Sequence, residues 1–226
     1  MPEAIGRPGF RIREEISRPD PGLVAELAKY PTSNIADAQE RFGFMDPGIR
    51  RISGCKLAGT AITVLTRPGD NLMVHKALEV ARPGDVVVVS TCRNDNTAVF
   101  GEIMATTLRG AGLEGAVVDG AVRDFDELQK MGVKVFARTV VGSACDKDGP
   151  GEINYPIACG GVAVLPGDVV IGDSDGVVVV RSQDLPVVLE KVRSISSGEA
   201  KRIEEIRRGL LFKPDINRTL SDKGVI

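Results

Sequence analysis

The chain has 226 residues, of which 42% are hydrophobic, and a formal net charge of −2 at pH 7. A chain of this length buries roughly 70% of the surface that its unfolded form exposes, so its core needs no disulfides or structural metals. The nearly neutral charge argues against a nucleic-acid-binding protein, because such proteins concentrate an excess of Lys and Arg on one face.

The sequence favours a cytoplasmic protein without a membrane anchor. Its first 16 residues, MPEAIGRPGFRIREEI, are charged and lack the apolar core of a secretory signal. The apolar runs are strand-sized, well short of the roughly 20 residues of a membrane-spanning helix. The cysteines lie far apart and form no CxxC pair, so free thiols that are buried or half-buried are expected. They are Cys55, Cys92, Cys145 and Cys159.

The first part of the chain is punctuated by prolines. Residues 1–20 are predicted to form an irregular arm. A short helix is predicted over 23–29, ending before Pro31. A second helix is predicted over SNIADAQERFG, 33–43, with Thr32 or Ser33 as its N-cap and a glycine at its end.

The middle of the chain alternates strands with helices. Strands are predicted over 55–66, 83–90, 115–120 and 133–139, because these segments are rich in β-branched residues. Helices are predicted over about 72–81, capped by Asp70 or Asn71, over about 101–112, and over 126–131. This order predicts an α/β fold with mixed sheets.

Later segments add tight turns and a helical tail. The turn of PGDVVVVS, 83–90, occurs again in PGDVVIGD, 166–173, and a hairpin is predicted from there through SDG into VVVVR. One long or broken helix is predicted over 185–208, interrupted around 196–198. No long linker divides the chain, so residues 1–226 are predicted to form a single domain. It has an N-terminal arm (about 1–20) and a helical tail (about 185–226).

The segment GEIMATTLRGAGLEGAVVDGAVRDFDE, 101–127, holds the strongest candidate site. Gly101 is predicted to precede a helix whose first amide N–H groups, on Glu102, Ile103 and Met104, lack partners within the helix. These groups carry the positive end of the helix dipole and bind carboxylates or phosphates. The alternative is an ordinary helix start with Glu102 as a favourable acid in its first turn.

The motif DGAVRD, 119–124, ends a predicted strand, and α/β folds place ligand sites beyond strand ends of this kind. Arg123 has a planar fork that grips a carboxylate at two points. Asp124 offers a hard oxygen ligand for magnesium or manganese, and Asp126 and Glu127 can add acceptors around it. The alternative is a surface ion pair between Arg123 and Asp124.

Twenty residues lie between Glu102 and Arg123. That spacing fits one helix, one turn and one strand, so the two motifs are expected to converge on the same small volume. A helix start, a cation and two or three carboxylates in one place favour metal-assisted chemistry on a small acidic substrate.

Other motifs are weaker. His75 is the only histidine, and a lone histidine in a helix is expected to be structural. The chain has no GxSxG motif for a serine nucleophile to pair with it. GAGLEG, 110–115, matches GxGxxG, but it is predicted to end a helix and enter a strand, whereas the dinucleotide-binding fingerprint has the reverse order.

The chain resembles the RraA-like family, which comprises the 4-hydroxy-4-methyl-2-oxoglutarate/4-carboxy-4-hydroxy-2-oxoadipate aldolases and the regulator of ribonuclease E activity A. The resemblance runs from about Asn34 to Val180 and includes SNIADA, GTAITV, PGDN, HKAL, PGDVVVV, GEIMA, VVDGAVRD and GGVAVLPGDVVIGDSDGVVVV. The specific part of the resemblance is a spaced motif: an acidic residue, then 20 residues, then an Arg-Asp pair, and a second acidic residue three positions after that Asp. Here these are Glu102, Arg123, Asp124 and Glu127.

The resemblance implies a swivelling β/β/α fold, assembled as a trimer or hexamer with active sites at subunit interfaces. It implies a class II pyruvate aldolase that depends on Mg²⁺ or Mn²⁺. Such an enzyme cleaves a 4-hydroxy-2-oxo acid of the 4-hydroxy-4-methyl-2-oxoglutarate type to pyruvate and also decarboxylates oxaloacetate. Neither nucleic acid nor membrane is implied as a partner.

The resemblance also assigns roles to residues. Asp124 would ligate the metal, Arg123 would bind the substrate, and Glu102 would handle a proton through a water molecule. The substrate-binding positions would be Gly101, Glu102, Ile103, Met104 and Arg123. A glutamate from the neighbouring subunit's C-terminal helix often completes the site, and the candidates are Glu199, Glu204 and Glu205.

Glu102 departs from the aldolase members of the family, which often carry Asp at this position, whereas regulator-type members also carry Glu. The extra methylene moves the carboxylate by about a bond length, and a misplacement of about 1 Å can cost on the order of a hundredfold in rate. The alternative function is therefore a non-catalytic regulator that binds a ribonuclease. The intact Arg-Asp-x2-Glu motif favours the enzyme.

Overall fold

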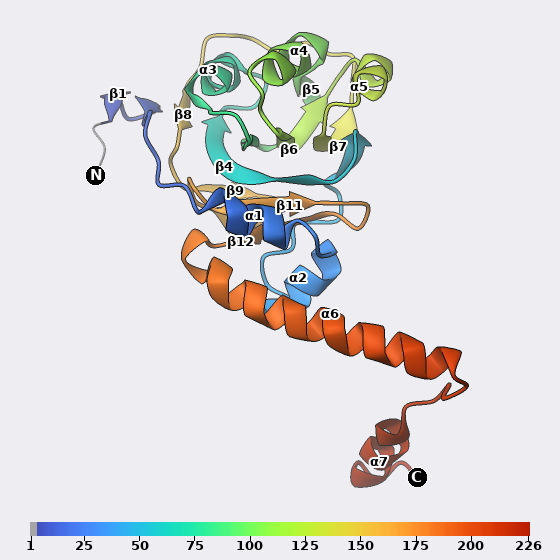
Figure 1. Cartoon of the computed structure of the whole chain (residues 1–226). Coiled ribbons are helices and arrows are strands. Elements are labelled where there is room, and N and C mark those ends of the chain that lie inside the picture. Colours follow the sequence, from blue (N-terminus) through green and yellow to red (C-terminus); the bar gives the residue numbers. More distant parts are fainter. Residues whose placement is uncertain (1–3) are drawn as a thin grey trace.

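Two β layers packed face to face form the centre of the protein, and helices cover both outer faces (Figure 1). The computed structural model describes residues 4–226. The first layer is built on four strands that run parallel to one another. They are β4 (Leu57–Thr66), β5 (Asp85–Phe100), β6 (Gly115–Val122) and β7 (Val135–Val140).

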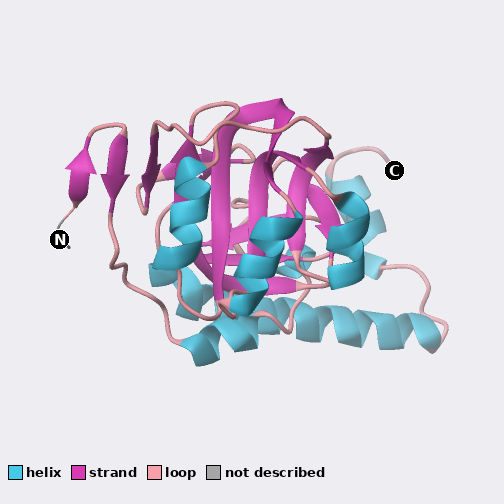
Figure 2. Cartoon of the chain, turned by 90° about the horizontal axis from the view of Figure 1, so that it is seen from above, coloured by secondary structure: helices cyan, strands magenta, loops and turns pink. Residues whose placement is uncertain are grey.

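Each connection between these parallel strands contains a helix. The three helices are α3 (Leu72–Val80), α4 (Glu102–Gly110) and α5 (Phe125–Met131), which agree with the predicted helices to within about two residues. All three lie across the same face of the sheet (Figure 2). The predicted βαβαβαβ order is therefore confirmed.

The second β layer contains an antiparallel hairpin of β11 (Val169–Gly172) and β12 (Val177–Val180), as predicted from the repeated PGD turn. Strand β11 also pairs with the first part of β4, which links the two layers. Strands β9 (Ile157–Cys159) and β10 (Val162–Val164) form a separate antiparallel pair.

Helices on the outer side of the second layer complete the fold. They are α1 (Pro21–Leu27), α2 (Thr32–Ala38) and α6 (Leu185–Arg207), with α6 preceded by a 3-10 turn over Ser182–Asp184. A last helix, α7 (Pro214–Asp222), lies beyond the end of α6, away from the β layers (Figure 1). The order of layers confirms the predicted α/β class with mixed sheets flanked by helices.

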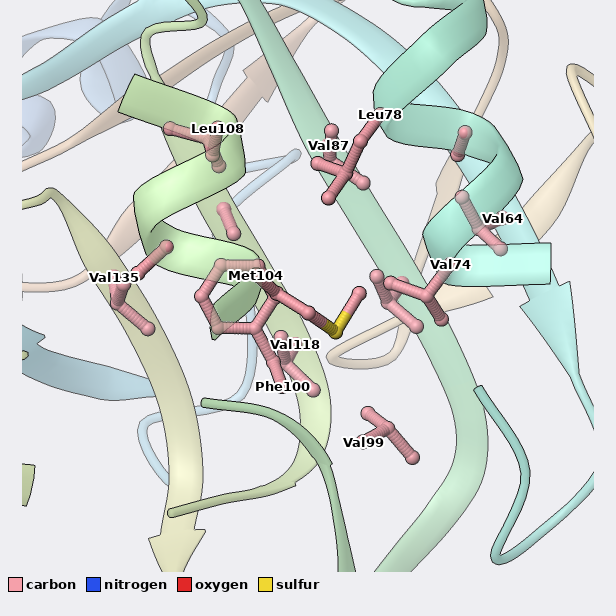
Figure 3. Close-up of a cluster of buried hydrophobic side chains, with 14 of the residues drawn as sticks. Val64, Val74, Leu78, Val87, Val99, Phe100, Met104, Leu108, Val118 and Val135 are labelled. Carbon is pink, nitrogen blue, oxygen red and sulfur yellow. The ribbon is translucent and has the colours of Figure 1, made fainter. Parts of the chain in front are cut away.

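The valine runs are explained by this layering. In β5, Val87 and Val89 face the α3–α5 helices, whereas Val86 and Val88 face the second β layer. Because this part of β5 is covered on both faces, its residues are apolar on both sides and the usual polar alternation disappears. Figure 3 shows the core on the helix side, where Met104 of α4 and Phe100 of β5 pack into one cluster.

The predicted irregular arm is partly wrong. Strands β1 (Ile5–Arg7) and β2 (Phe10–Ile12) form a hairpin, and β2 pairs in parallel with β8 (Gly151–Ile153). Side-chain contacts hold this edge in place, since Arg11 Nε donates to Glu152 Oε1 at 2.7 Å. Residues 1–3 of the predicted arm lie outside the described residues. At the other edge of the sheet, β3 (Arg50–Ser53) pairs with β7.

Helix ends show further differences. Neither Thr32 nor Ser33 caps α2, because the Thr32 amide and hydroxyl both donate to the carboxylate of Asp173. The helix stops at Ala38, and the backbone then turns through left-handed conformations at Glu40 and Arg41. The expected interruption of the C-terminal helix does not occur, since α6 is continuous over Leu185–Arg207.

The cysteines are less buried than expected. All four are free, but only Cys159 is buried and Cys145 half-buried, whereas Cys55 and Cys92 are exposed. Among residues 4–226, no helix combines the length and apolar character needed to cross a bilayer.

Phe136 provides a test of the packing between the two β layers. Its side chain is fully buried, and its ring lies so close to Gly172 that an added Cβ there would be 2.9 Å away. We expect Phe136→Ala to lower the free energy of unfolding by about 3–5 kcal/mol, because the second layer cannot collapse into the cavity. Urea denaturation measures this, and Phe42→Ala, at a position 77% exposed, is the matched control with little expected change.

Candidate active site at the ends of β5 and β6

The pairing of β5 with β6 brings the two predicted motifs together. Phe100, the last residue of β5, lies opposite Val122, the last residue of β6. The next residues, Gly101 and Arg123, are therefore neighbours, and the Arg123 amide donates to the Phe100 carbonyl at 3.0 Å. The predicted convergence of 101–104 with 123–124 is thus present in the structure.

Gly101 is required by the close approach of the Arg123–Asp124 pair. A Cβ at this position would lie 2.5 Å from Asp124 Oδ2 and 2.9 Å from Arg123 Cγ. The backbone of Gly101 is extended, with φ −160°, so space rather than backbone conformation excludes a side chain. Glycine at 101 therefore allows the Asp124 carboxylate to reach the start of α4.

The Asp124 carboxylate caps α4. Its Oδ2 accepts the amide N–H of Glu102 at 3.0 Å and lies 3.5 Å from Arg123 Nε. Asp124 itself has a left-handed backbone, with φ 58° and ψ 45°, which Asp tolerates better than most residues. This conformation ends β6 and begins α5, and it directs the side chain back toward α4 rather than along α5.

This geometry corrects one part of the expected anion site. The Glu102 amide already has a partner in Asp124, so only the later amides of the first turn, on Ile103 and Met104, remain for a ligand. The Ile103 side chain is exposed, whereas that of Met104 is buried in the core, so Met104 can offer a ligand its backbone more readily than its side chain.

A cavity of about 210 Å³ opens beside Gly101 and Arg123. This is smaller than the roughly 300–1,000 Å³ of sites for drug-sized ligands, so the cavity suits a small metabolite. Two of its side chains, Arg123 and Lys147, are cationic, and no Asp or Glu lines it within the described part of the chain. The other lining residues are Asn71, His75, Ala98, Phe100, Gly101, Ile103, Met104, Ala144 and Cys145.

His75, expected to be structural, lines this cavity from α3. Burial, together with the nearby charge of Lys147, lowers the pKa of His75 below its ordinary value. Burial raises the pKa of the Cys145 thiol, with Lys147 acting in the opposite direction. The imidazole and the thiol are therefore both held in their neutral forms near pH 7.

Asn71 was predicted only as a helix cap, and the structure places it in the cavity wall. Its side chain does not cap α3; instead Nδ2 donates to the Val99 carbonyl at 3.2 Å. Its Oδ1 is buried and accepts no hydrogen bond within residues 4–226. Both residues belong to segments singled out in the sequence: Asn71 to PGDN and His75 to HKAL. Helix α3 begins at the same edge of the sheet as α4, and this position brings both residues to the cavity.

Asp70 anchors the loop that forms the far side of this wall. Its carboxylate is fully buried and accepts three backbone N–H groups. Oδ1 accepts from Leu72, at the start of α3, at 2.9 Å. Oδ2 accepts from Asp148 at 2.7 Å and from Gly149 at 2.9 Å, both in the loop. Burial alone raises the pKa of Asp70, but these three donors and Arg67 outweigh it, so the pKa lies below its ordinary value. The loop 144–149 is thereby fixed to the start of α3.

The predicted acidic residues separate into two groups. Glu102 and Asp124 lie next to Gly101, whereas Glu127 pairs with Lys130 at 2.7 Å on the exposed side of α5. The C-terminal glutamates are on α6, on the opposite side of the β layers from α4 (Figure 1). In this chain they contact other side chains: Glu199 with Asn34, Glu204 with Arg208, and Glu205 with Arg202.

The donor set at Asp124 is compatible with a hydrated magnesium ion. Among residues 4–226, no cluster of three or more His, Cys, Asp or Glu side chains could enclose a metal. Asp124 is about one-third exposed, and its Oδ1 accepts no hydrogen bond from those residues. Mg²⁺ keeps several waters and is held by one or two carboxylates, so one free carboxylate oxygen at an open site fits it.

Comparison with known proteins agrees with this geometry. The family model described as RraA-like, Aldolase/RraA, matches residues 32–179. The chain belongs to the RraA-like family. A Halalkalibacterium halodurans member, provisionally named 4-hydroxy-4-methyl-2-oxoglutarate aldolase, is 33% identical over 188 residues, which cover 83% of this chain and 90% of that protein.

Solved structures of RraA-like relatives have the same fold. An uncharacterised protein from Pseudomonas syringae has a TM-score of 0.78 and 26% identity, covering 86% of this chain and 92% of that one. The RNA-processing inhibitor RraA from Thermus thermophilus has a TM-score of 0.62 and 30% identity, covering 66% and 92% respectively. Relatives named as aldolases and as regulators are thus both similar to this chain.

Asp70 gives a prediction on stability. Asp70→Asn replaces one acceptor oxygen by an NH2 donor that faces backbone N–H groups. We expect it to lower the free energy of unfolding by roughly 2–3 kcal/mol at pH 7, because at least one buried donor loses its acceptor. The matched control is Asp146→Asn, since Asp146 is exposed and, within residues 4–226, its carboxylate contacts only Arg67, at 3.4 Å.

The effect should depend on pH. Because the folded pKa of Asp70 is depressed, its carboxylate contributes stability above the unfolded pKa of about 3.9 and loses it as pH falls through the lower folded pKa. The difference in urea midpoint between wild type and Asp70→Asn should therefore be largest at pH 6–7 and shrink below about pH 4. A difference that stays constant to pH 2.5 would contradict this assignment.

Proposed function

We propose that this RraA-like protein is a divalent-metal-dependent class II pyruvate aldolase. It cleaves a 4-hydroxy-2-oxo acid of the 4-hydroxy-4-methyl-2-oxoglutarate type to pyruvate and also decarboxylates oxaloacetate. The observation that carries the proposal is the convergence at Gly101: the Asp124 carboxylate, the Arg123 guanidinium and a helix start meet beside a small cavity lined by two cations. The provisional aldolase name of the Halalkalibacterium halodurans relative supports it.

In this proposal Arg123 and the first turn of α4 hold the 2-oxo acid. Arg123 is partly exposed and lines the cavity, so its fork can bind the carboxylate of the substrate at two points. The amides of Ile103 and Met104 add hydrogen-bond donors at the positive end of the helix dipole. Holding the carboxylate in this way orients the adjacent keto group and the bond to be broken.

Asp124 would hold the metal through its free Oδ1, while Oδ2 stays on the Glu102 amide. When bound, a divalent cation polarises the keto oxygen of the substrate as a Lewis acid. The Glu102 contact fixes the Asp124 rotamer in advance, so the metal ligand is preorganised. Mg²⁺ and Mn²⁺ both favour such carboxylate oxygens.

Aldol cleavage breaks the bond between C3 and C4 of the substrate. The C4 hydroxyl gives its proton to a water held by Glu102 and becomes a carbonyl, and the electron pair of the broken bond forms the enolate of pyruvate. That enolate then takes a proton at C3. Glu102 is exposed in the first turn of α4, where its carboxylate can hold the water that delivers this proton. Oxaloacetate decarboxylation forms the same enolate, with CO₂ as the leaving fragment.

The proposal includes a cytoplasmic homo-oligomer, a trimer or hexamer, in which a glutamate of α6 completes a neighbour's site. The position of α6 supports this, because the helix that carries Glu199, Glu204 and Glu205 lies on the far side of the β layers from α4 and α5 (Figure 1). These glutamates would therefore reach the site of another copy rather than that of their own chain.

A second candidate function is a non-catalytic regulator that binds a ribonuclease. The observation in its favour is the similarity to the Thermus thermophilus protein described as an RNA-processing inhibitor. A regulator of this kind needs a protein-binding surface but no free carboxylate oxygen at Asp124. The two functions therefore differ in their dependence on that residue.

We expect Asp124→Asn to reduce metal-dependent pyruvate release at least about 100-fold while leaving the fold intact. Asn tolerates the left-handed backbone and can still accept the Glu102 amide, so the main loss is the charge that holds the cation. A coupled pyruvate-release assay on branched 4-hydroxy-2-oxo acids and oxaloacetate, with and without Mg²⁺, measures this. Asp126→Asn, on the neighbouring exposed turn, is the control and should retain activity.

Activity that persists in excess chelator would contradict the metal-dependent proposal. Saturable binding to a ribonuclease that is unchanged in Asp124→Asn, together with no pyruvate release from any substrate by wild type, would favour the regulator instead.

Gly101→Ala tests the geometry that carries the proposal. The added methyl group would lie 2.5 Å from Asp124 Oδ2, so the flexible carboxylate must leave the Glu102 amide. We expect a loss of activity of about tenfold to a hundredfold with unfolding stability lowered by no more than about 1–2 kcal/mol. Gly110→Ala, in the last turn of α4 with open space around it, is the matched control.

A further inference from the structure

Lys147 is the second cation of the cavity, and its backbone is fixed on both sides. Before it, the Asp146 amide donates to the Gly69 carbonyl at 2.8 Å, and the Asp146 carbonyl accepts from the Asn71 amide at 3.0 Å. After it, the Asp148 amide donates to the buried Asp70 carboxylate at 2.7 Å. Lys147 therefore starts from a fixed point on the cavity wall, although it lies in a polar loop.

Two acids near Lys147, Asp70 and Asp146, have other partners. Asp70 accepts three backbone N–H groups, and the Asp146 carboxylate lies 3.4 Å from Arg67. Within residues 4–226 Lys147 forms no ion pair. Since no Asp or Glu of the described chain lines the cavity, the positive charge of Lys147 is not neutralised there.

The charge of Lys147 also acts on the interior of the cavity. It contributes to the lowered pKa of His75, after burial, and it opposes the effect of burial on the pKa of Cys145. His75 and Cys145 both line the cavity, so an anion placed between these residues and Lys147 would experience the same field. Arg123, directly after β6, supplies the other positive charge.

We propose that Lys147 is a specificity-determining residue that binds the second carboxylate of a dicarboxylic 2-oxo acid, while Arg123 binds the first. This inference rests on the proposed function. Arg123 and Lys147 both line the cavity, and the Asp124 carboxylate, 3.5 Å from Arg123, is the proposed metal ligand. A dianion is therefore favoured over a monoanion such as pyruvate, because each of its carboxylates finds a cation. The volume of about 210 Å³ limits the ligand to a small acid.

The test compares a dianionic with a monoanionic ligand in Lys147→Gln. Oxaloacetate decarboxylation requires a substrate with two carboxylates. Exchange of the methyl protons of pyruvate with deuterated water requires only one, and it reports on enolate formation at the same centre. We expect Lys147→Gln to raise KM for oxaloacetate about tenfold, the effect of losing one partly solvated charged contact. It should not lower kcat, because the carboxylate that Lys147 holds leaves as neutral CO₂.

The same variant should change the KM of pyruvate in proton exchange by less than about twofold. Lys147→Arg keeps the charge and should restore KM for oxaloacetate to within a few-fold. Lys76→Gln is the matched control, because Lys76 is a neighbouring cation on α3 that pairs with Glu79 at 2.7 Å and does not line the cavity. It should resemble wild type in both assays.

The outcomes separate the two proposals. If wild type shows neither decarboxylation nor proton exchange with Mg²⁺ or Mn²⁺, the proposed function fails. If wild type is active and Lys147→Gln has an unchanged KM for oxaloacetate, or loses both activities in equal proportion, the role of Lys147 in reading the second carboxylate is overturned.

Discussion

The parallel register of β5 and β6 is the constraint on which the site depends. Because Phe100 lies opposite Val122, the residues that leave the two strands meet at one edge of the sheet. A one-residue slip would turn toward the second β layer the β6 residues that now pack under α3–α5, and it would move Arg123 away from Gly101. Val99 and Phe100 at the end of β5 and Val122 at the end of β6 are buried in the core under α3–α5, and this packing opposes such a slip.

Gly101 and Asp124 depend on each other at this edge. The left-handed backbone of Asp124 turns its carboxylate toward α4, and the missing side chain at Gly101 leaves room for it. The Asp124 carboxylate then satisfies the amide of Glu102, which would otherwise lack a partner at the helix start. One carboxylate oxygen is thus used for structure, and the other remains for a ligand.

The sequence predicted the elements whose pattern is local. The valine-rich strands and the helices between them were predicted because an apolar run or a helical repeat of apolar residues is visible within about ten residues of sequence. The convergence of 101–104 with 123–124 was predicted from the spacing of 20 residues between Glu102 and Arg123. The strand β2 was missed because its pairing with β8, about 140 residues away, depends on Arg11 meeting Glu152, a contact that no local pattern encodes.

The cavity wall was harder to predict for the same reason. Lys147 lies in a loop of polar residues without periodicity, and Asp70 brings that loop to the site across 78 residues of sequence. The role of a residue in such a loop depends on the contacts that anchor the loop more than on its neighbours in the sequence. His75 was predicted to be structural because a lone helical histidine has no visible partner. The residues that line the cavity with it, Lys147 and Cys145, come from that loop.

The site therefore has two parts with different origins. Gly101, Arg123 and Asp124 lie at the ends of β5 and β6, so the strand register that stabilises the core also sets their geometry. Lys147 lies on a loop held by a few hydrogen bonds to Asp70 and its neighbours. Changes in the loop can alter which ligand fits without disturbing the strand ends, whereas changes at the strand ends affect the core as well.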